Sequence, residues 1–358
     1  MASILVLGAS YGSLLATKLL MAHHRVTLVC TAPTAALINR EGTVVRFPVK
    51  GREGLVEIAS RDLPGLLQAA TPDAVQPEAF DLAVLGMQES QYGEPGVRSL
   101  MQRIARARVP CLAIMNMPPP PYLRRIPRVD ADLLDDCYTA PELWAAFDPE
   151  LVTLASPDPQ AFRPAGEPKN VLQVGLPTNF KAARFAGEAP TRLLRGLAGE
   201  IEDARFALGG ETLDIPVKLK VHESLFVPLA KWPMLMTGNY RCIRPQGMIA
   251  IQEAVHGDLE RSRAIYAWVS DLCCRLGADP EDLVPFEKYA AAAASLKKPS
   301  SAARALDAGA QNIERVDALV RRLAGQLGLA HHDLQEMVGL IDARLAANRV
   351  AHAEPLAA

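Results

Sequence analysis

The sequence lacks any apolar run close to the ~18 residues that a membrane-spanning helix needs. It also lacks an excess of charge, because 38 Lys and Arg residues stand against 40 Asp and Glu residues, a formal net charge of -2. Without a general positive field, the chain is not expected to bind nucleic acid or an anionic membrane. Residues 1–7 have no basic leader and no small-residue cleavage site, so we expect a strand there rather than a signal peptide.

The few cysteines lack the spacing of a metal site and have no evident disulfide partner. Cys273 and Cys274 are adjacent in the chain, which makes them poor partners for each other. We therefore expect six buried free thiols, as in a protein of the reducing cytoplasm. The two histidine pairs, at residues 23–24 and 331–332, have no third ligand near them in sequence, so no metal site is predicted.

A chain of 358 residues is too long for one ordinary hydrophobic core, and two domains are expected. Residues 3–7 form a continuous apolar run, as in a buried parallel strand. Residues 13–22 then have the apolar spacing of a helix, and residues 24–30 that of a second strand. Later apolar segments predict two more buried strands and two hairpins, at residues 81–85 and 111–115, 43–47 with 55–58, and 160–163 with 171–174.

Helical patterns dominate from about residue 190 onward, at residues 191–206, 225–240, 249–276, 300–325 and 333–347. The sequence therefore predicts an α/β domain of Rossmann type over residues 1–186. An all-α domain is predicted over residues 187–350. The long helices after residue 300 are a candidate surface for a homodimer.

A turn of small residues, Gly8-Ala9-Ser10-Tyr11-Gly12, joins the first strand to the first helix. In such a turn, backbone amides can approach a pyrophosphate, and the helix N-terminus adds partial positive charge. Ser10 stands at the middle glycine position, and the turn is one residue short of the usual pattern. We predict a dinucleotide site formed by Gly8, Ser10, Tyr11, Gly12 and Ser13, with the Ser13 hydroxyl on a phosphate. The alternative is a tight turn that binds no ligand.

The end of the second strand indicates which dinucleotide would bind. NAD sites place Asp or Glu there to hold the ribose 2′-hydroxyl. Here the segment is Cys30-Thr31-Ala32-Pro33, which contains no acid. The absence favours NADPH over NAD, because a carboxylate would repel a 2′-phosphate, and Thr31 and Arg40 are candidate phosphate contacts.

Segments spread along the chain resemble the ketopantoate reductase (2-dehydropantoate 2-reductase) family. They are the glycine turn and residues 85–91, 114–116, 231–239 and 300–309. The resemblance implies a Rossmann domain followed by a helical domain, the 6-phosphogluconate-dehydrogenase-like arrangement. It also implies reduction of a 2-keto acid by NADPH, with a lysine as general acid. Three positions depart from the family pattern: Gln88 replaces a cofactor-side lysine, Leu235 an asparagine and Ile313 an acid. A carbonyl compound other than ketopantoate is therefore the expected substrate.

Lys231 is the candidate proton donor, because it lies among apolar neighbours in a predicted helix, where an ammonium is costly unless it faces a cleft or a partner. Its alternative role is a surface lysine with a buried stem. Asn239, eight residues later, is expected on the same helix face as a catalytic or substrate contact, or else as a helix-end cap. Arg241 is a candidate for a substrate carboxylate. Ser301 is a candidate for the same group or a helix cap.

Asn116 follows a predicted strand at the end where open α/β sheets bind ligands, so we expect it to contact the nicotinamide or the substrate. Gln88 is expected on the cofactor side of the site. Two other functions compete with simple reduction of a keto acid. One is an opine-type dehydrogenase, which joins an amino acid to a keto acid. The other is a sensor that binds NADP(H) without turnover.

Overall fold

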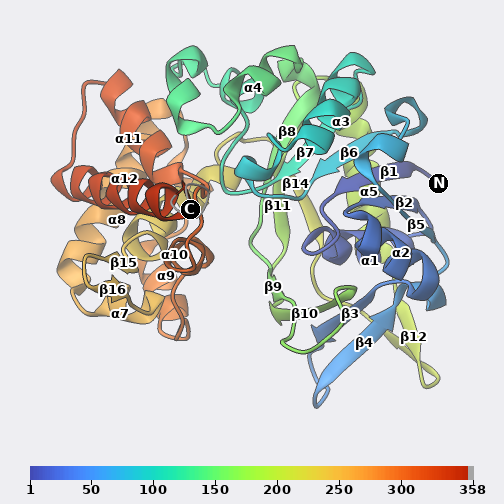
Figure 1. Ribbon diagram of the computed structural model, residues 1–358. Coiled ribbons are helices and arrows are strands. Elements are labelled where there is room, and N and C mark those ends of the chain that lie inside the picture. The colour runs from blue at the N-terminus through green and yellow to red at the C-terminus, as the bar shows by residue number, and fades with distance from the viewer. Residues whose placement is uncertain (354–358) are drawn as a thin grey trace. The chain divides into compact units, whose positions relative to one another are not determined.

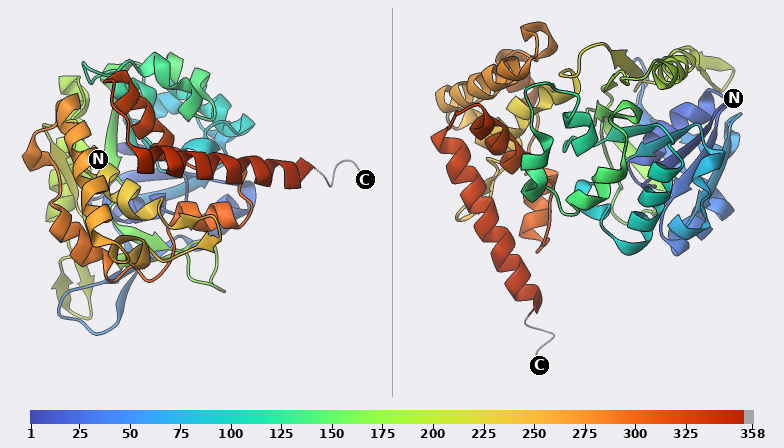
Figure 2. Two further views of the ribbon diagram at one scale, coloured as in Figure 1. Left: turned by 90° about the vertical axis from the view of Figure 1, so that its left-hand side faces the viewer. Right: turned by 90° about the horizontal axis from the view of Figure 1, so that it is seen from above.

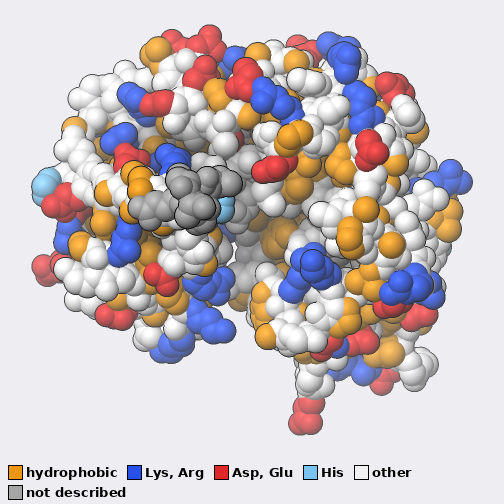
Figure 3. All heavy atoms as spheres, viewed as in Figure 1, with side chains coloured by type: hydrophobic (Ala, Val, Ile, Leu, Met, Phe, Trp, Pro, Cys, Tyr) orange, Lys and Arg blue, Asp and Glu red, His pale blue; other side chains and the backbone are white. Residues whose placement is uncertain are grey.

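The computed structural model describes residues 1–353 and divides into two compact units (Figure 1). The first unit contains Met1–Met87, Gln91–Arg125 and Glu142–Glu223. The second contains Gln88–Ser90, Ile126–Pro141 and the chain from Ser224 onward. Along the described chain, none of the helices has the length and apolar character required to cross a membrane. Side chains of both charge signs are interspersed over the face seen in Figure 3.

The first unit is built on an eight-stranded sheet with the order β14-β11-β8-β7-β6-β1-β2-β5. From β5 to β8 the strands are parallel and follow the Rossmann order, so the predicted α/β fold is confirmed. The chain adds strands first on one side of β1 and then, from β6, on the other, so the strand order reverses between β1 and β6. The strands are β1 (Ser3–Leu7), β2 (Arg25–Val29), β5 (Leu66–Ala70), β6 (Leu82–Leu85), β7 (Cys111–Ile114), β8 (Val152–Ser156), β11 (Phe180–Ala183) and β14 (Leu219–His222).

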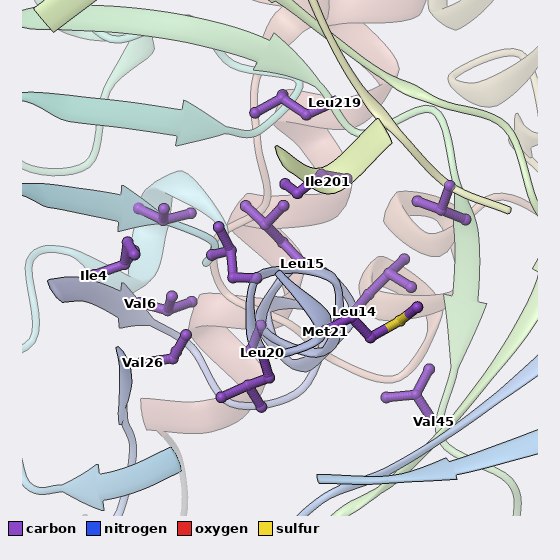
Figure 4. Packing of buried hydrophobic residues seen from close by; sticks show 14 of the residues in the cluster. Ile4, Val6, Leu14, Leu15, Leu20, Met21, Val26, Val45, Ile201 and Leu219 are labelled. Atoms are coloured by element: carbon purple, nitrogen blue, oxygen red, sulfur yellow. The ribbon is translucent and has the colours of Figure 1, made fainter. Parts of the chain in front are cut away.

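Helix α1 (Gly12–Met21) lies in the centre of this unit and is buried along its whole length. Leu15 and Leu20 pack among strand residues such as Ile4 and Val26, and Ile201 of another helix closes the same cluster (Figure 4). The helix is surrounded because the main sheet and other elements cover different sides of it. A fully buried first helix positions its N-terminus rigidly at the glycine turn.

Lys18 is the exception in this apolar helix, because it is buried yet carries an ammonium group. Its Nζ donates to the Ile215 carbonyl at 2.7 Å. Burial, together with the nearby positive charge of Lys218, lowers the pKa of Lys18 to about 7. Periodicity alone does not reveal the burial of this residue, because a lysine in a helix is usually exposed.

Replacing Lys18 by methionine is expected to stabilise the fold at low pH and to lose that advantage at high pH. The buried charge of Lys18 destabilises the folded wild-type protein by its full amount below about pH 7. The cost is relieved as pH rises toward 10.4, because the folded protein has then released a proton that the unfolded chain still holds. Urea unfolding should show the advantage of Lys18→Met shrinking by about 2–3 kcal/mol from about pH 6 to about pH 9. Lys220→Met removes an exposed lysine and should show no such trend. A pH-independent difference for Lys18→Met would contradict the assignment.

A second, four-stranded sheet has the order β4-β3-β10-β9. Its strands are β3 (Val44–Pro48), β4 (Leu55–Ala59), β9 (Gln160–Phe162) and β10 (Val171–Leu176). The β3–β4 and β9–β10 pairs are antiparallel, which confirms both predicted hairpins. The two hairpins join through a parallel pairing of β10 with β3, although about 110 residues separate them.

The first unit continues beyond residue 186, where the sequence analysis placed the domain boundary. Helix α5 (Glu188–Asp203) and strand β14 belong to the first unit, which extends to Glu223. β14 pairs with β11 in parallel, and α5 packs on β14 and α1. The helical patterns that dominate after residue 190 gave no sign of β14, the short strand at the edge of the main sheet.

The second unit is mainly helical, but the structure interrupts three predicted helices, at residues 225–240, 249–276 and 300–325. The 249–276 pattern breaks at Gly257 into α7 (Ile251–His256) and α8 (Leu259–Leu276). The 300–325 pattern divides into α10 (Ser301–Asp307) and α11 (Val316–Gln326). The last helix, α12 (His332–Ala353), is long and continuous (Figure 2). All six cysteines are free thiols, and Cys111, Cys137, Cys242 and Cys273 are buried.

The remaining elements are short or peripheral. They are α2 (Ala32–Glu41), α3 (Pro95–Arg106), α4 (Pro120–Leu123), α9 (Phe286–Ala293) and the small hairpins β12–β13 (Phe206–Leu208, Glu211–Leu213) and β15–β16 (Ile243–Arg244, Gly247–Met248).

Candidate functional site

Three loops of the first unit leave the same edge of the main sheet. Leu7 pairs with Leu85, and Leu85 pairs with Ala113, so β1, β6 and β7 end at one level. Gly8 and Gly86 directly follow their strands, and Asn116 comes two residues after β7. Adjacent strands lie about 4.8 Å apart, so these three loops form one contiguous edge. The edge includes the reversal between β1 and β6, where open α/β sheets bind ligands.

Glycine is required at this edge because the backbones approach closely. Gly8 has φ of +101°, which L side chains rarely adopt. A Cβ at Gly86 would lie 3.1 Å from the Leu7 carbonyl oxygen, and one at Gly12 would lie 2.6 Å from Val6 Cγ1. The turn between β1 and α1 is therefore pressed against the loop after β6, as a pyrophosphate turn needs.

The amides at the start of α1 are available to an anion. Within residues 1–353, no acceptor bonds the backbone N–H groups of Ser10, Tyr11 or Gly12. The first turn of the helix has no acidic side chain to oppose a phosphate. These amides and the positive end of the helix dipole together fit a pyrophosphate group.

Two side chains predicted to contact the cofactor have bonds elsewhere. The Ser13 hydroxyl is buried and donates to the Ser10 carbonyl at 2.7 Å. The Tyr11 hydroxyl donates to the Pro159 carbonyl at 2.6 Å, and burial raises its pKa, which keeps it protonated. Both residues therefore shape the turn through their side chains, and the backbone amide of Tyr11 remains for a ligand.

The two predicted phosphate contacts after β2 lie apart. Thr31 is exposed at the start of α2, and its hydroxyl donates to Thr34 Oγ1 at 3.1 Å. Arg40 is in the last turn of α2, about 13 Å further along the helix, and pairs with Glu41. The structure thus keeps Thr31 at the carboxyl end of β2 and removes Arg40 from it.

In the second unit, Lys231 and Asn239 lie on an irregular helical segment. A 3-10 turn (Pro228–Lys231) leads into α6 (Trp232–Met234), and a π turn (Leu235–Asn239) follows. In a regular α-helix, eight residues would overshoot two turns by about 80°. One α turn and one wider π turn together take about eight residues, so the π turn aligns Asn239 with Lys231. Both residues are half-buried.

A residue of another helix makes a hydrogen bond to the π turn. The Tyr289 hydroxyl from α9 donates to the Met234 carbonyl at 3.1 Å, an oxygen that the π turn releases from α-helical bonding. Gly238 is required opposite it, because a Cβ there would collide with the Tyr289 hydroxyl. The Tyr240 amide bonds the Leu235 carbonyl at 3.0 Å, five residues back, which closes the π turn.

Arg241 follows the π turn and is buried with one hydrogen-bonded nitrogen. Its Nη1 donates to Ser262 Oγ at 2.7 Å and to the Thr237 carbonyl at 3.3 Å. Among residues 1–353, no carboxylate forms an ion pair with Arg241. Burial and the charges of Arg244 and Arg261 lower its pKa, whereas the carboxylates of Asp333 and Asp258, which form no ion pair with it, oppose the shift. A buried guanidinium without a carboxylate favours an anionic ligand.

The helix cap of α10 is Ser300 and not Ser301, the residue predicted as a possible cap. Ser300 caps the helix, because its Oγ accepts from the Ala303 amide at 3.1 Å. The same hydroxyl donates to the Asn239 carbonyl at 2.6 Å. Ser301 is the exposed first residue of α10 and is not the cap. Ser300 therefore links this helix to the π turn, a role that sequence reasoning missed.

The three departures from the family pattern lie in different environments. Leu235 and Ile313 are buried apolar residues, whereas Gln88 is exposed. Next to Gln88, the buried Glu89 accepts from the Thr139 amide and hydroxyl, each at 2.9 Å. Burial raises the pKa of Glu89, and these bonds oppose the rise. Glu89 thus attaches the 88–90 segment to residues 126–141, a role that its place after a strand did not reveal.

The comparisons with known proteins agree with the fold. No family model matches the sequence, and no curated protein matches it. D-mandelate dehydrogenase, solved with NADH and anilino(oxo)acetate, matches with a TM-score of 0.64 and 13% identity over 97% of this chain and 99% of that one. A 2-dehydropantoate 2-reductase from Methylococcus capsulatus matches with 0.68 and 12% over 97% and 98%. A dimeric ketopantoate reductase from Staphylococcus aureus matches with 0.60 and 12% over 97% and 99%.

These likenesses extend over nearly the whole chain at low identity, so they concern the fold. The predicted fold class, a Rossmann-type domain followed by a helical one, is confirmed. The resemblance to ketopantoate reductases noted from the sequence is confirmed at the same level.

Proposed function

We propose that this protein is an NADPH-dependent reductase of a small 2-keto acid or a related carbonyl compound. The observation that carries the proposal is the set of free amides at the start of α1, in a glycine turn at the reversal point of the sheet. That arrangement fits the pyrophosphate of a dinucleotide. The structural neighbours support the reaction class, since their names are those of keto-acid reductases and a hydroxy-acid dehydrogenase.

Reduction needs a hydride at the carbonyl carbon, which the reduced nicotinamide supplies when bound. The carbonyl oxygen needs a proton, and Lys231 is the proposed donor. Its ammonium also stabilises the alkoxide as negative charge develops. Asn239, aligned with Lys231 by the π turn, would donate a hydrogen bond to the same substrate.

The substrate carboxylate is assigned to Arg241, whose buried guanidinium pairs with no carboxylate of the described chain. Ser301 is the second candidate for this group. Asn116, at the carboxyl edge of the main sheet, is the proposed contact to the nicotinamide or the substrate. Gln88, beside the anchored Glu89, is the proposed cofactor-side residue.

NADPH is expected to bind at least about tenfold more tightly than NADH. The reason is that no acid follows β2, so nothing there repels a 2′-phosphate or holds a free 2′-hydroxyl. Titration of the purified protein by nucleotide fluorescence measures both dissociation constants. Equal or reversed affinities would contradict the NADPH assignment, whereas binding of neither nucleotide would remove the proposed function.

Turnover separates the proposal from its two alternatives. NADPH consumption with 2-keto acids supports a reductase, and consumption only when an amino acid is also present indicates opine chemistry. Binding without turnover indicates a sensor, an alternative that the apolar Leu235 and Ile313 favour. The homodimer stays a prediction, supported by the dimeric state named for one neighbour.

A further inference from the structure

A strand of the second sheet lies beside the proposed dinucleotide turn. Tyr11 of the turn donates from its hydroxyl to Pro159, the residue directly before β9. The Tyr11 ring also makes an edge contact with Phe180, with ring centroids 6.0 Å apart. The β9 segment is therefore held at one end against the start of α1, within the first unit.

The side chains of this segment alternate between two faces. Ala161 packs against the same hydrophobic core as Tyr11 and Cys30, whereas Phe162 is 51% exposed. Strand side chains two residues apart point the same way, so Arg163 is directed to the face of Ala161. That face packs on the hydrophobic core against which Tyr11, in the turn after β1, and Cys30, directly after β2, also pack.

The charge of Arg163 acts at the end of β2, on the thiol of Cys30. Burial raises the pKa of the Cys30 thiol to about 11, and the positive charge of Arg163 opposes that rise. Cys30 immediately follows β2 and precedes Thr31. No carboxylate in residues 1–353 forms an ion pair with the exposed Arg163, because Glu167 of the same hairpin pairs with Arg46 instead.

We propose that Arg163, extending from the β9–β10 hairpin to the end of β2, binds the 2′-phosphate of NADPH together with Thr31. A 2′-phosphate at the end of β2 needs a cation. The residues directly after β2 supply none, and Arg40 is at the far end of α2. A guanidinium forms paired charge-assisted hydrogen bonds to a phosphate, and the Thr31 hydroxyl adds one more. This inference rests on the proposed function and names the residue that decides its cofactor.

The test measures binding of nucleotides that differ only in the 2′-phosphate. Arg163→Ala is expected to weaken NADPH about 10- to 100-fold, the usual effect of losing a charge-assisted phosphate contact, and to leave NADH within about twofold. The fragment 2′,5′-ADP should lose affinity by the same factor, which needs neither nicotinamide nor activity. Lys169→Ala removes one positive charge from the same hairpin and should change none of these values.

The outcomes separate this assignment from the proposed function. Equal losses for NADPH and NADH in Arg163→Ala would overturn it, and so would an unchanged NADPH affinity, while both leave the reductase proposal standing. Wild-type protein that binds neither nucleotide would overturn both. Thermal unfolding is the control for the fold. If Arg163→Ala unfolds at the same temperature as the wild type, a loss of NADPH binding reflects the lost contact.

Discussion

Replacing Lys231 by alanine is expected to lower kcat/KM for the best keto-acid substrate by about 10²- to 10⁴-fold, the usual effect of a positioned general acid. NADPH affinity should change little, because the amides proposed for the pyrophosphate belong to the other unit. Stability should change little, since alanine is a good helix former at this half-buried position. Steady-state kinetics, nucleotide titration and thermal unfolding measure the three quantities.

Two variants make this result specific to the proton donor. Lys231→Arg keeps the charge but should recover little activity, because guanidinium does not release its proton near neutral pH. Lys288→Ala makes the same change at an exposed lysine of α9 in the same unit and should leave the rate unchanged. Lost stability together with lost rate in Lys231→Ala would indicate a structural ion pair instead. A near-normal rate would remove Lys231 from the mechanism.

Replacing Ser10 by aspartate is expected to weaken binding of both NADPH and NADH by about 10²- to 10³-fold. The new carboxylate would stand at the unbonded amides where the pyrophosphate is proposed to bind. Two unit charges about 4 Å apart near a protein surface repel by about 4 kcal/mol, which is nearly a thousandfold in affinity. Nucleotide titration at moderate ionic strength measures the loss.

The fold provides an internal control for this variant. An acid at the N-terminus of a helix is stabilising, so Ser10→Asp should unfold at the same or a higher temperature while it loses the ligand. Ser10→Asn has nearly the same shape without the charge and should bind within a few-fold of wild type. Gly12 is less suitable, because any side chain there would collide with Val6 in the core. Unaltered affinity in Ser10→Asp would place the pyrophosphate elsewhere.

Local sequence determined the β1–α1–β2 unit and both hairpins. Residues 3–7 are apolar without interruption, the glycine turn follows, and the next ten residues repeat at helical spacing. Each of these signals is contained in about thirty consecutive residues, and hydrophobic periodicity with turn chemistry is sufficient to interpret it. The chain likewise showed which acid is missing after β2, the basis of the NADPH prediction.

Tertiary structure decided the features that depend on distant partners. β14 is four residues long and pairs with β11 at the edge of the main sheet, so local periodicity did not show that the first unit continues past residue 186. The π turn between Lys231 and Asn239 is hydrogen-bonded by Tyr289, which lies 55 residues after the carbonyl it binds. The buried Lys18 finds its acceptor at the Ile215 carbonyl, 197 residues later in the chain. Likewise, the charge of Arg163 acts on Cys30, 133 positions earlier in the chain, in a fold where β10 pairs with β3. Periodicity cannot predict such contacts, because it reports on one segment at a time and each contact joins two segments that are distant in the chain.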